Sequence, residues 1–169
     1  MQKIARILVD QAHNQAWTID PALAARMNQA NPADASYEQL AAAADAEGFA
    51  IAAHASGLIT DETLAQVDVL VLPHASTDEW EKTVGSGNPM LADSELVAIE
   101  AFVAAGGGLL ILGETEQPKY GNNFDALAGR FGVKIVNATV QDTERNFNDV
   151  PTWILGEFER LSDSDFAYR

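Results

Sequence analysis

The sequence contains no cysteine, and this absence excludes several kinds of chemistry at once. Disulfide bonds, thiolate nucleophiles and cysteine-ligated zinc all require the missing side chain. An enzyme that depends on a catalytic cysteine is therefore excluded.

Basic residues are scarce, with 10 Lys and Arg against 25 Asp and Glu and a formal net charge of -15. A nucleic-acid partner requires clustered Lys and Arg to contact phosphates, so we expect none. The same charge disfavours an anionic membrane surface. It is compatible with a soluble protein or with a basic protein partner.

Long apolar runs are also missing, because no stretch approaches the roughly 20 residues that a membrane span needs. The first residues, Met1 to Ile7, lead directly into a predicted strand and do not resemble a signal peptide. We therefore expect no membrane association and a cytoplasmic location, unless the chain is a piece of a longer protein.

Apolar runs alternate with helical patterns along the 169 residues, which suffice for one ordinary domain. This alternation predicts an α/β fold, a three-layer sandwich with a mostly parallel sheet. We expect the strands near 4–9, 67–72 and 108–113 to be central. The predicted strands are 4–9, 49–53, 67–72, 108–113 and 133–136, and the predicted helices are 21–27, 36–47, 60–65, a helix from Asp93 and a helix from Asn122 or Asn123.

The stretch from Ala104 to Gln117 organises this pattern. Alanines end a helix, three glycines turn the backbone, four aliphatic residues form a strand, and polar residues follow at once. In an open parallel sheet, ligands bind beyond the carboxyl ends of the strands. Glu114, Thr115 and Glu116 are expected there.

Three segments carry a resemblance to a known family: 102–114, 120–127 and 131–139. The run Gly106-Gly-Gly-Leu-Leu-Ile-Leu-Gly-Glu114 and the later Tyr120-Gly-Asn-Asn-Phe124 are its most specific parts. They resemble the class I glutamine amidotransferase-like superfamily, in the non-catalytic branch shared by gliding-motility transporter auxiliary subunits, an intraflagellar-transport subunit and trehalose-utilisation-like proteins. The resemblance implies a flavodoxin-like sandwich that binds sugars or partner proteins.

The resemblance covers residues 4–141 and predicts a domain over 1–141. Residues 142–169 are then a C-terminal extension, interpreted as the start of a missing downstream domain. Catalytic relatives carry a Gly-x-Cys-x-Gly elbow, whereas this chain reads Gly113-Glu-Thr-Glu-Gln117. Thr115 replaces the cysteine and Gln117 the second glycine, so a cysteine-dependent glutamine amidotransferase is excluded.

Polar side chains follow three of the predicted strands, and two long loops, 11–35 and 75–92, follow two of them. Because long loops at the strand ends are often functional, we expect them to form the main pocket, faced by His74 and Glu114 with Trp17 or Trp80 at its wall. The predicted ligand-binding residues are Asp10, Gln11, His13, Asn14, Trp17, His74, Ser76, Glu114, Thr115, Glu116, Tyr120 and Asn123.

Several interpretations of these residues stay open. The preferred function is a non-catalytic binding module for a small polar ligand, such as a sugar, or for a partner protein. The first alternative is a hydrolase or metal-dependent enzyme that uses His74, Glu114 and Asp10. The second is a structural domain of a larger assembly, in which the polar residues only bond one another and cap loops. We expect no cofactor and no resident metal, and leave a homodimer open.

Overall fold

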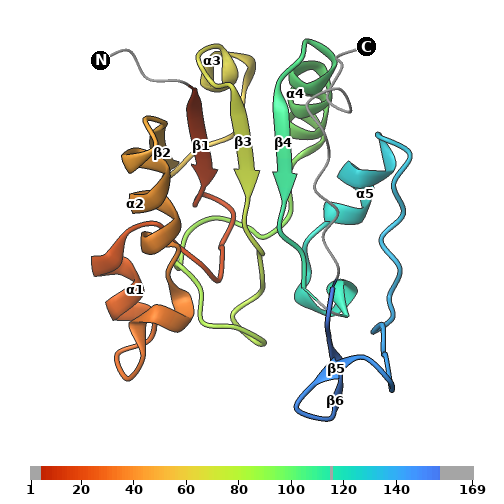
Figure 1. The fold of residues 1–169 in the computed structure, drawn as a ribbon. Helices are drawn as coiled ribbons and strands as arrows, with labels where there is room; N and C mark the ends of the chain where they lie inside the picture. Colours follow the sequence, from red (N-terminus) through yellow and green to blue (C-terminus); the bar gives the residue numbers. More distant parts are fainter. Residues whose placement is uncertain (1–4, 115, 157–169) are drawn as a thin grey trace. The chain divides into compact units, whose positions relative to one another are not determined.

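The computed structural model describes residues 5–114 and 116–156, and a parallel sheet lies at its centre (Figure 1). Its strands are β1 (Arg6–Asp10), β2 (Ala50–His54), β3 (Val69–Leu72) and β4 (Gly108–Ile111). The strands lie in the order β2-β1-β3-β4, and each neighbouring pair is parallel. This is the order with which flavodoxin-like folds begin. The predicted α/β class is confirmed.

Helices connect the strands, and the handedness of the connections assigns them to faces. The chain moves one way across the sheet from β1 to β2 and the other way from β2 to β3 to β4. Right-handed crossovers therefore put the first helices on one face and the later ones on the other, which gives three layers. The helices are α1 (Pro21–Met27), α2 (Glu38–Ala46), α3 (Asp61–Leu64), α4 (Asp93–Ala104) and α5 (Phe124–Gly129), with short 3₁₀ turns η1 (Pro32–Ala35) and η2 (Gln117–Tyr120).

The main apolar core joins the sheet to α4 and α5. Leu70 and Leu72 of β3 are fully buried, and so are Ile99 of α4 and Phe124 and Leu127 of α5. These residues keep strand spacing in β3 and helical spacing in the helices, so each element turns one apolar side to the same cluster. Burial of each side chain contributes roughly 1.5–3 kcal/mol.

The expectation that three strands are central holds for β1 and β3 but is wrong for β4, which is an edge strand among the described residues. The predicted fifth strand, residues 133–136, is not a strand in the structure. Only Ile135 of that segment packs against the core, while Val133 and Val136 are 56% and 65% exposed. Without burial of its apolar side chains, the segment lacks the main stabilisation of a strand.

The helix predicted over 60–65 begins at Asp61 in the structure, and the helix predicted from Asp93 begins at that residue. Thr60 caps α3 by accepting a hydrogen bond from the backbone N–H of Thr63 at 3.3 Å. Asp93 is the first residue of α4 and not its cap. The Glu95 carboxylate instead accepts a bond from the Ala92 N–H at 2.8 Å, the half of a capping box that an alanine side chain cannot reciprocate.

The residues from Ala138 onward form a second compact unit, separate from Met1–Asn137. It contains an antiparallel hairpin of β5 (Asn146–Phe147) and β6 (Val150–Ile154). Asn148 and Asp149 turn it with φ of 56° and 58°, the left-handed backbone that a tight hairpin turn requires. Residues 157–169 of the predicted C-terminal extension lie outside the described residues. None of the helices in the described part of the chain is long and apolar enough to cross a membrane.

Candidate functional site

The two long loops lie beyond the carboxyl ends of the strands and are joined to each other there (Figure 1). Gln15 and Ala75 form an isolated antiparallel bridge. Beside it, the Ala16 N–H donates to the His74 carbonyl at 2.9 Å, and the Ser76 N–H donates to the Asn14 carbonyl at 3.2 Å. The ends of β1 and β3 flank the point where the strand order reverses, the usual ligand site of this fold. In this chain, the paired segments 14–16 and 74–76 lie there.

A buried charged cluster surrounds His13. Its Nδ1 lies 2.8 Å from Oδ2 of Asp10, and its Nε2 lies 3.0 Å from Oε1 of Glu95. All three residues are at least 96% buried, because their exposed fractions are 0–4%. Glu95 also accepts hydrogen bonds from the backbone N–H groups of Ile59 and Ala92, at 2.7 and 2.8 Å. The cluster thus ties the loop after β1 to the start of α4 and to the segment before α3.

The balance of charges in this cluster raises the pKa of His13. Burial alone lowers the pKa, but hydrogen bonds and charge from Asp10, then from Glu95, outweigh it. These contacts favour the imidazolium form of the ring between the two carboxylates. Asp10 has further donors, from the Ala12 N–H at 3.0 Å and the Gln15 amide. Asp10 and His13 were predicted to face a ligand, and the structure engages both in this internal network.

Three more predicted site residues hold the loops in place. The Gln11 amide donates to the Thr18 hydroxyl. The Asn14 amide donates to the Ser76 carbonyl at 2.8 Å and to Asp78 at 3.0 Å. The Ser76 hydroxyl donates to the Thr77 carbonyl at 2.9 Å. Its proton is therefore not donated to a general base, as the proton of a serine nucleophile would be.

His74 behaves differently, because neither nitrogen of its buried ring has a hydrogen-bond partner among the described residues. Two neighbouring buried groups share this property: the Thr77 hydroxyl and the Gln117 amide nitrogen. The Thr77 N–H donates to the Tyr120 carbonyl at 2.9 Å, which joins the loop after β3 to η2. Buried polar groups without a partner are rare in folded proteins and each calls for an explanation.

The electrostatic surroundings keep His74 neutral. Burial lowers its pKa, and the charge of Glu114 raises it by less. Burial raises the pKa of Tyr37, and the charge of Glu114 raises it further. Glu114 therefore lies close enough to act on both His74 and Tyr37, as predicted for residues at neighbouring strand ends. Trp17 stacks on Tyr37 with ring centroids 5.1 Å apart, which places aromatic surface beside this group.

Two further predicted residues, Glu116 and Asn123, form their polar contacts with other residues of the chain. Glu116 has a left-handed φ of 54° and pairs with Lys119 at 2.7 Å, and this bond lowers the Glu116 pKa. Both amide atoms of Asn123 bond the backbone of Leu91, at 2.8 and 2.9 Å. Thr115 lies outside the described residues.

Three cavities of the described structure have walls that do not include His74, Thr77 or Gln117. The two long loops do enclose a cavity of about 670 Å³, between the end of α1 and residues 78–85. Its wall does not include His74, Glu114, Trp17 or Trp80, so the prediction placed the right loops but the wrong side chains. A cavity of about 470 Å³ lies beside His13 and Glu95.

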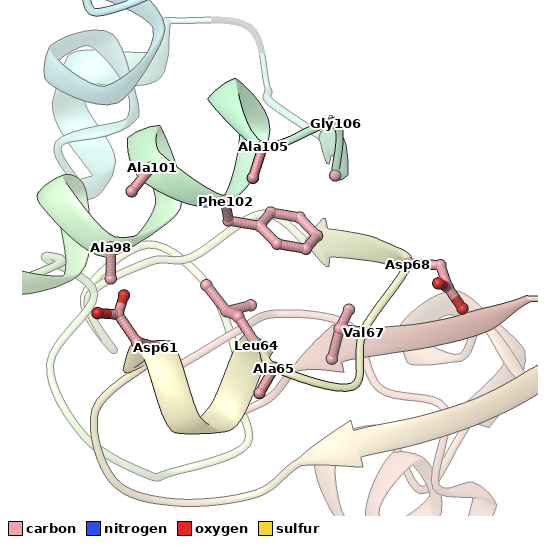
Figure 2. A pocket seen from close by; sticks show the side chains of 11 residues that line it. Asp61, Leu64, Ala65, Val67, Asp68, Ala98, Ala101, Phe102, Ala105 and Gly106 are labelled. Carbon is pink, nitrogen blue, oxygen red and sulfur yellow. The ribbon is translucent and has the colours of Figure 1, made fainter.

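A further cavity of about 520 Å³ lies near the amino ends of the strands, at the end of the sheet opposite the two long loops, between α3 and α4 (Figure 2). Figure 2 shows Phe102 projecting from α4 toward the side on which α3 lies. Asp61 and Asp68 lie at the rim of the cavity. The glycine run belongs to this end of the sheet: a β-carbon on Gly107 would lie 2.3 Å from the Phe102 ring. No predicted site residue lines this cavity.

Within the described residues, no cluster of three or more His, Cys, Asp or Glu side chains could hold a metal ion. The donor atoms of Asp10, His13 and Glu95 bond one another and the backbone.

Sequence reasoning missed three residues of this region: Glu95, Thr77 and Gln117. Glu95 carried a usable signal, since an acidic residue in the first turn of a helix favours a capping role. Thr77 and Gln117 carried none, because burial without a partner depends on tertiary packing. No protein-family model and no curated protein sequence matches this chain. The superfamily resemblance therefore stays a prediction from the motifs.

Proposed function

We propose that this chain is a non-catalytic binding module for a small, neutral, polar ligand of the sugar class, held where β3 and β4 end. Three buried groups carry the proposal: the His74 ring nitrogens, the Thr77 hydroxyl and the Gln117 amide nitrogen, which have no hydrogen-bond partner among the described residues. A buried polar group left unsatisfied costs about 1–3 kcal/mol, and ligand hydroxyl groups would remove that cost.

The surroundings favour a neutral ligand over an anion. Glu114 contributes negative charge beside His74 and Tyr37. The Lys119 ammonium, 5.0 Å from the centroid of the Tyr120 ring, is paired with Glu116. Tyr120 and the Trp17–Tyr37 stack provide aromatic faces, which suit the apolar side of a sugar ring.

A binding role also fits the chemistry of the side chains better than catalysis. The Ser76 hydroxyl and the Asp10–His13 pair are engaged in bonds that stabilise the loops. His74 is neutral but has no hydrogen-bonded nucleophile among the described residues, the arrangement on which base-activated nucleophiles depend.

Calorimetric titration with a panel of neutral mono- and disaccharides tests the proposal. At least one sugar is expected to bind, and His74→Leu to weaken it about tenfold or more, as expected for a lost ligand hydrogen bond. His54→Leu is the matched control, because His54 lies at the edge strand β2 and bonds the Gly57 carbonyl at 3.1 Å. No binding by any sugar, or equal losses in both variants, would refute the proposal.

A partner-protein role is the second candidate. Phe147 and Trp153 of the hairpin stack with centroids 6.0 Å apart, although they are 53% and 55% exposed. A two-stranded hairpin is at best marginally stable alone, so exposed aromatics on one favour burial against another surface. Sedimentation velocity over a concentration series tests the simplest form, self-association, and Trp153→Ser should reduce it. A monomer at every concentration would exclude the homodimer.

A further inference from the structure

With both carboxylates ionised, the two hydrogen bonds of His13 require its ring to carry two protons. Nδ1 faces Asp10 at 2.8 Å and Nε2 faces Glu95 at 3.0 Å. A neutral imidazole has one N–H group and one lone pair. Loss of the proton therefore breaks one of the two bonds and turns a lone pair toward a carboxylate.

No other described charged group takes part in this contact. Asp10 faces His13 from the end of β1, and Glu95 faces it from α4. The loops that close over the same side contribute Gly57, Leu58, Gly87, Asn88, Met90 and Leu91, none of which titrates. With Asp10 and Glu95 ionised, the two bonds of the cluster depend on the second proton of the His13 ring.

The segment that His13 anchors continues directly into the His74 region. Residues 14–16 follow His13 and pair with 74–76 through the Gln15–Ala75 bridge. His74 is only 4% exposed, so a ligand reaches its ring when these segments separate. Gly87 packs over the same segment so closely that a β-carbon there would lie 1.9 Å from the Ala12 carbonyl oxygen.

We propose that His13 is a protonation-dependent latch, which holds the segment 11–18 on the strand ends while its ring bridges Asp10 and Glu95 and releases the segment when the proton leaves. The consequence, a His74 site that opens as pH rises, rests on the proposed function. The latch itself does not, and its test uses no ligand.

The test follows the histidine rings and the loop amides of the ¹⁵N-labelled chain over the range in which histidines titrate. With three histidines in the sequence, the ring signals are readily resolved. The His13 midpoint should lie above the ordinary histidine value of about 6.5. Protection of the amides in 11–18 and 74–76 against hydrogen exchange should decrease as pH rises through the His13 midpoint, after correction for the intrinsic pH dependence of exchange. Protection of the amides in α4 should not decrease there.

Glu95→Gln removes one carboxylate and should lower the His13 midpoint by about one pH unit or more. The pH at which the loop amides lose protection should decrease by the same amount. Glu100→Gln, on the exposed side of the same helix, should change neither. If Glu95→Gln fails to fold, the wild-type chain still tests the latch, because its His13 midpoint can be compared with the pH at which the loop amides lose protection. A His13 midpoint at or below about 6.5, or loop protection that does not change with the His13 titration, would overturn the latch. Failure of sugar binding alone would leave it standing.

Discussion

The ring of His74 meets the ring of Tyr120 edge to face, with centroids 4.3 Å apart and planes at 83°. This packing holds the imidazole against an aromatic surface while both nitrogens lack a partner among the described residues. His13, which follows a neighbouring strand, has a carboxylate at each nitrogen. The two buried histidines thus occupy opposite environments within one pair of loops.

Their opposite environments predict how stability depends on pH. The His13 pKa is raised, so its contribution is complete below the unfolded pKa of about 6.5 and is lost as pH rises toward the folded pKa. The His74 pKa is lowered, so its contribution is complete above about 6.5 and is lost as pH falls toward the folded pKa. Urea unfolding should therefore show the histidine-dependent stability highest near pH 6.5. A His13→Asn variant that keeps the full loss at high pH would contradict this assignment.

Glu95→Ala should destabilise the fold strongly. It leaves the N–H groups of Ile59 and Ala92 and the His13 ring without their shared acceptor. Removing one member of a buried ion pair typically costs about 3–5 kcal/mol. Glu100→Ala is the control on the same helix, where the pair with Arg130 is partly exposed and should contribute less than about 1 kcal/mol. Equal losses in urea unfolding would show that the Glu95 contacts contribute little.

Gly87→Ala should also destabilise the loops, and Gly85→Ala should do so less. Both glycines have left-handed φ, 70° and 74°, which costs an alanine about 1–2 kcal/mol. Only at Gly87 would the added carbon clash, at 1.9 Å from the Ala12 carbonyl oxygen, whereas nothing lies within 4 Å at Gly85. Gly87→Ala should therefore cost at least about 1 kcal/mol more by urea unfolding. A smaller difference would mean that the loop moves away freely.

Thr77→Val separates a ligand-binding role from a structural one. The Thr77 hydroxyl is buried without a described partner, so its removal should leave the free protein equally or more stable, within about 0.5 kcal/mol of wild type if not above it. Thr60→Val is the control, because that hydroxyl caps α3 and its loss should cost about 1 kcal/mol. A clear loss of stability in Thr77→Val would assign its hydroxyl to the fold.

The sequence predicted the elements that apolar runs define. The buried strand β3 and the alternation of strand and helix follow from local pattern, so the α/β class and the positions of β1 and β3 were accessible. The edge position of β4 was not, because Val133 and Val136 form an apolar pattern that is more than half exposed in the structure. Pattern alone does not report burial.

The candidate site was predicted in outline for a similar reason. Parallel strands end at one edge, so the sequence correctly brought His74 and Glu114 near each other. It could not pair His13 with Glu95, which lies 82 residues away on a helix whose placement depends on tertiary packing. One alternative did have the polar residues bond one another, as Asp10 and His13 do, but the sequence did not indicate that His74 would bond nothing described.

Mapping a bound sugar by backbone and side-chain chemical shifts tests the central claim most directly. Sugars from the panel would be added to the labelled chain up to about 20 mM, well above a millimolar dissociation constant. The account predicts that the largest shifts fall on His74, Thr77 and Gln117, and that Thr77→Val weakens binding about tenfold without unfolding the chain. Shifts confined to the cavities at 26–30 or 98–107, or no shift with any sugar, would contradict a ligand site at the ends of β3 and β4.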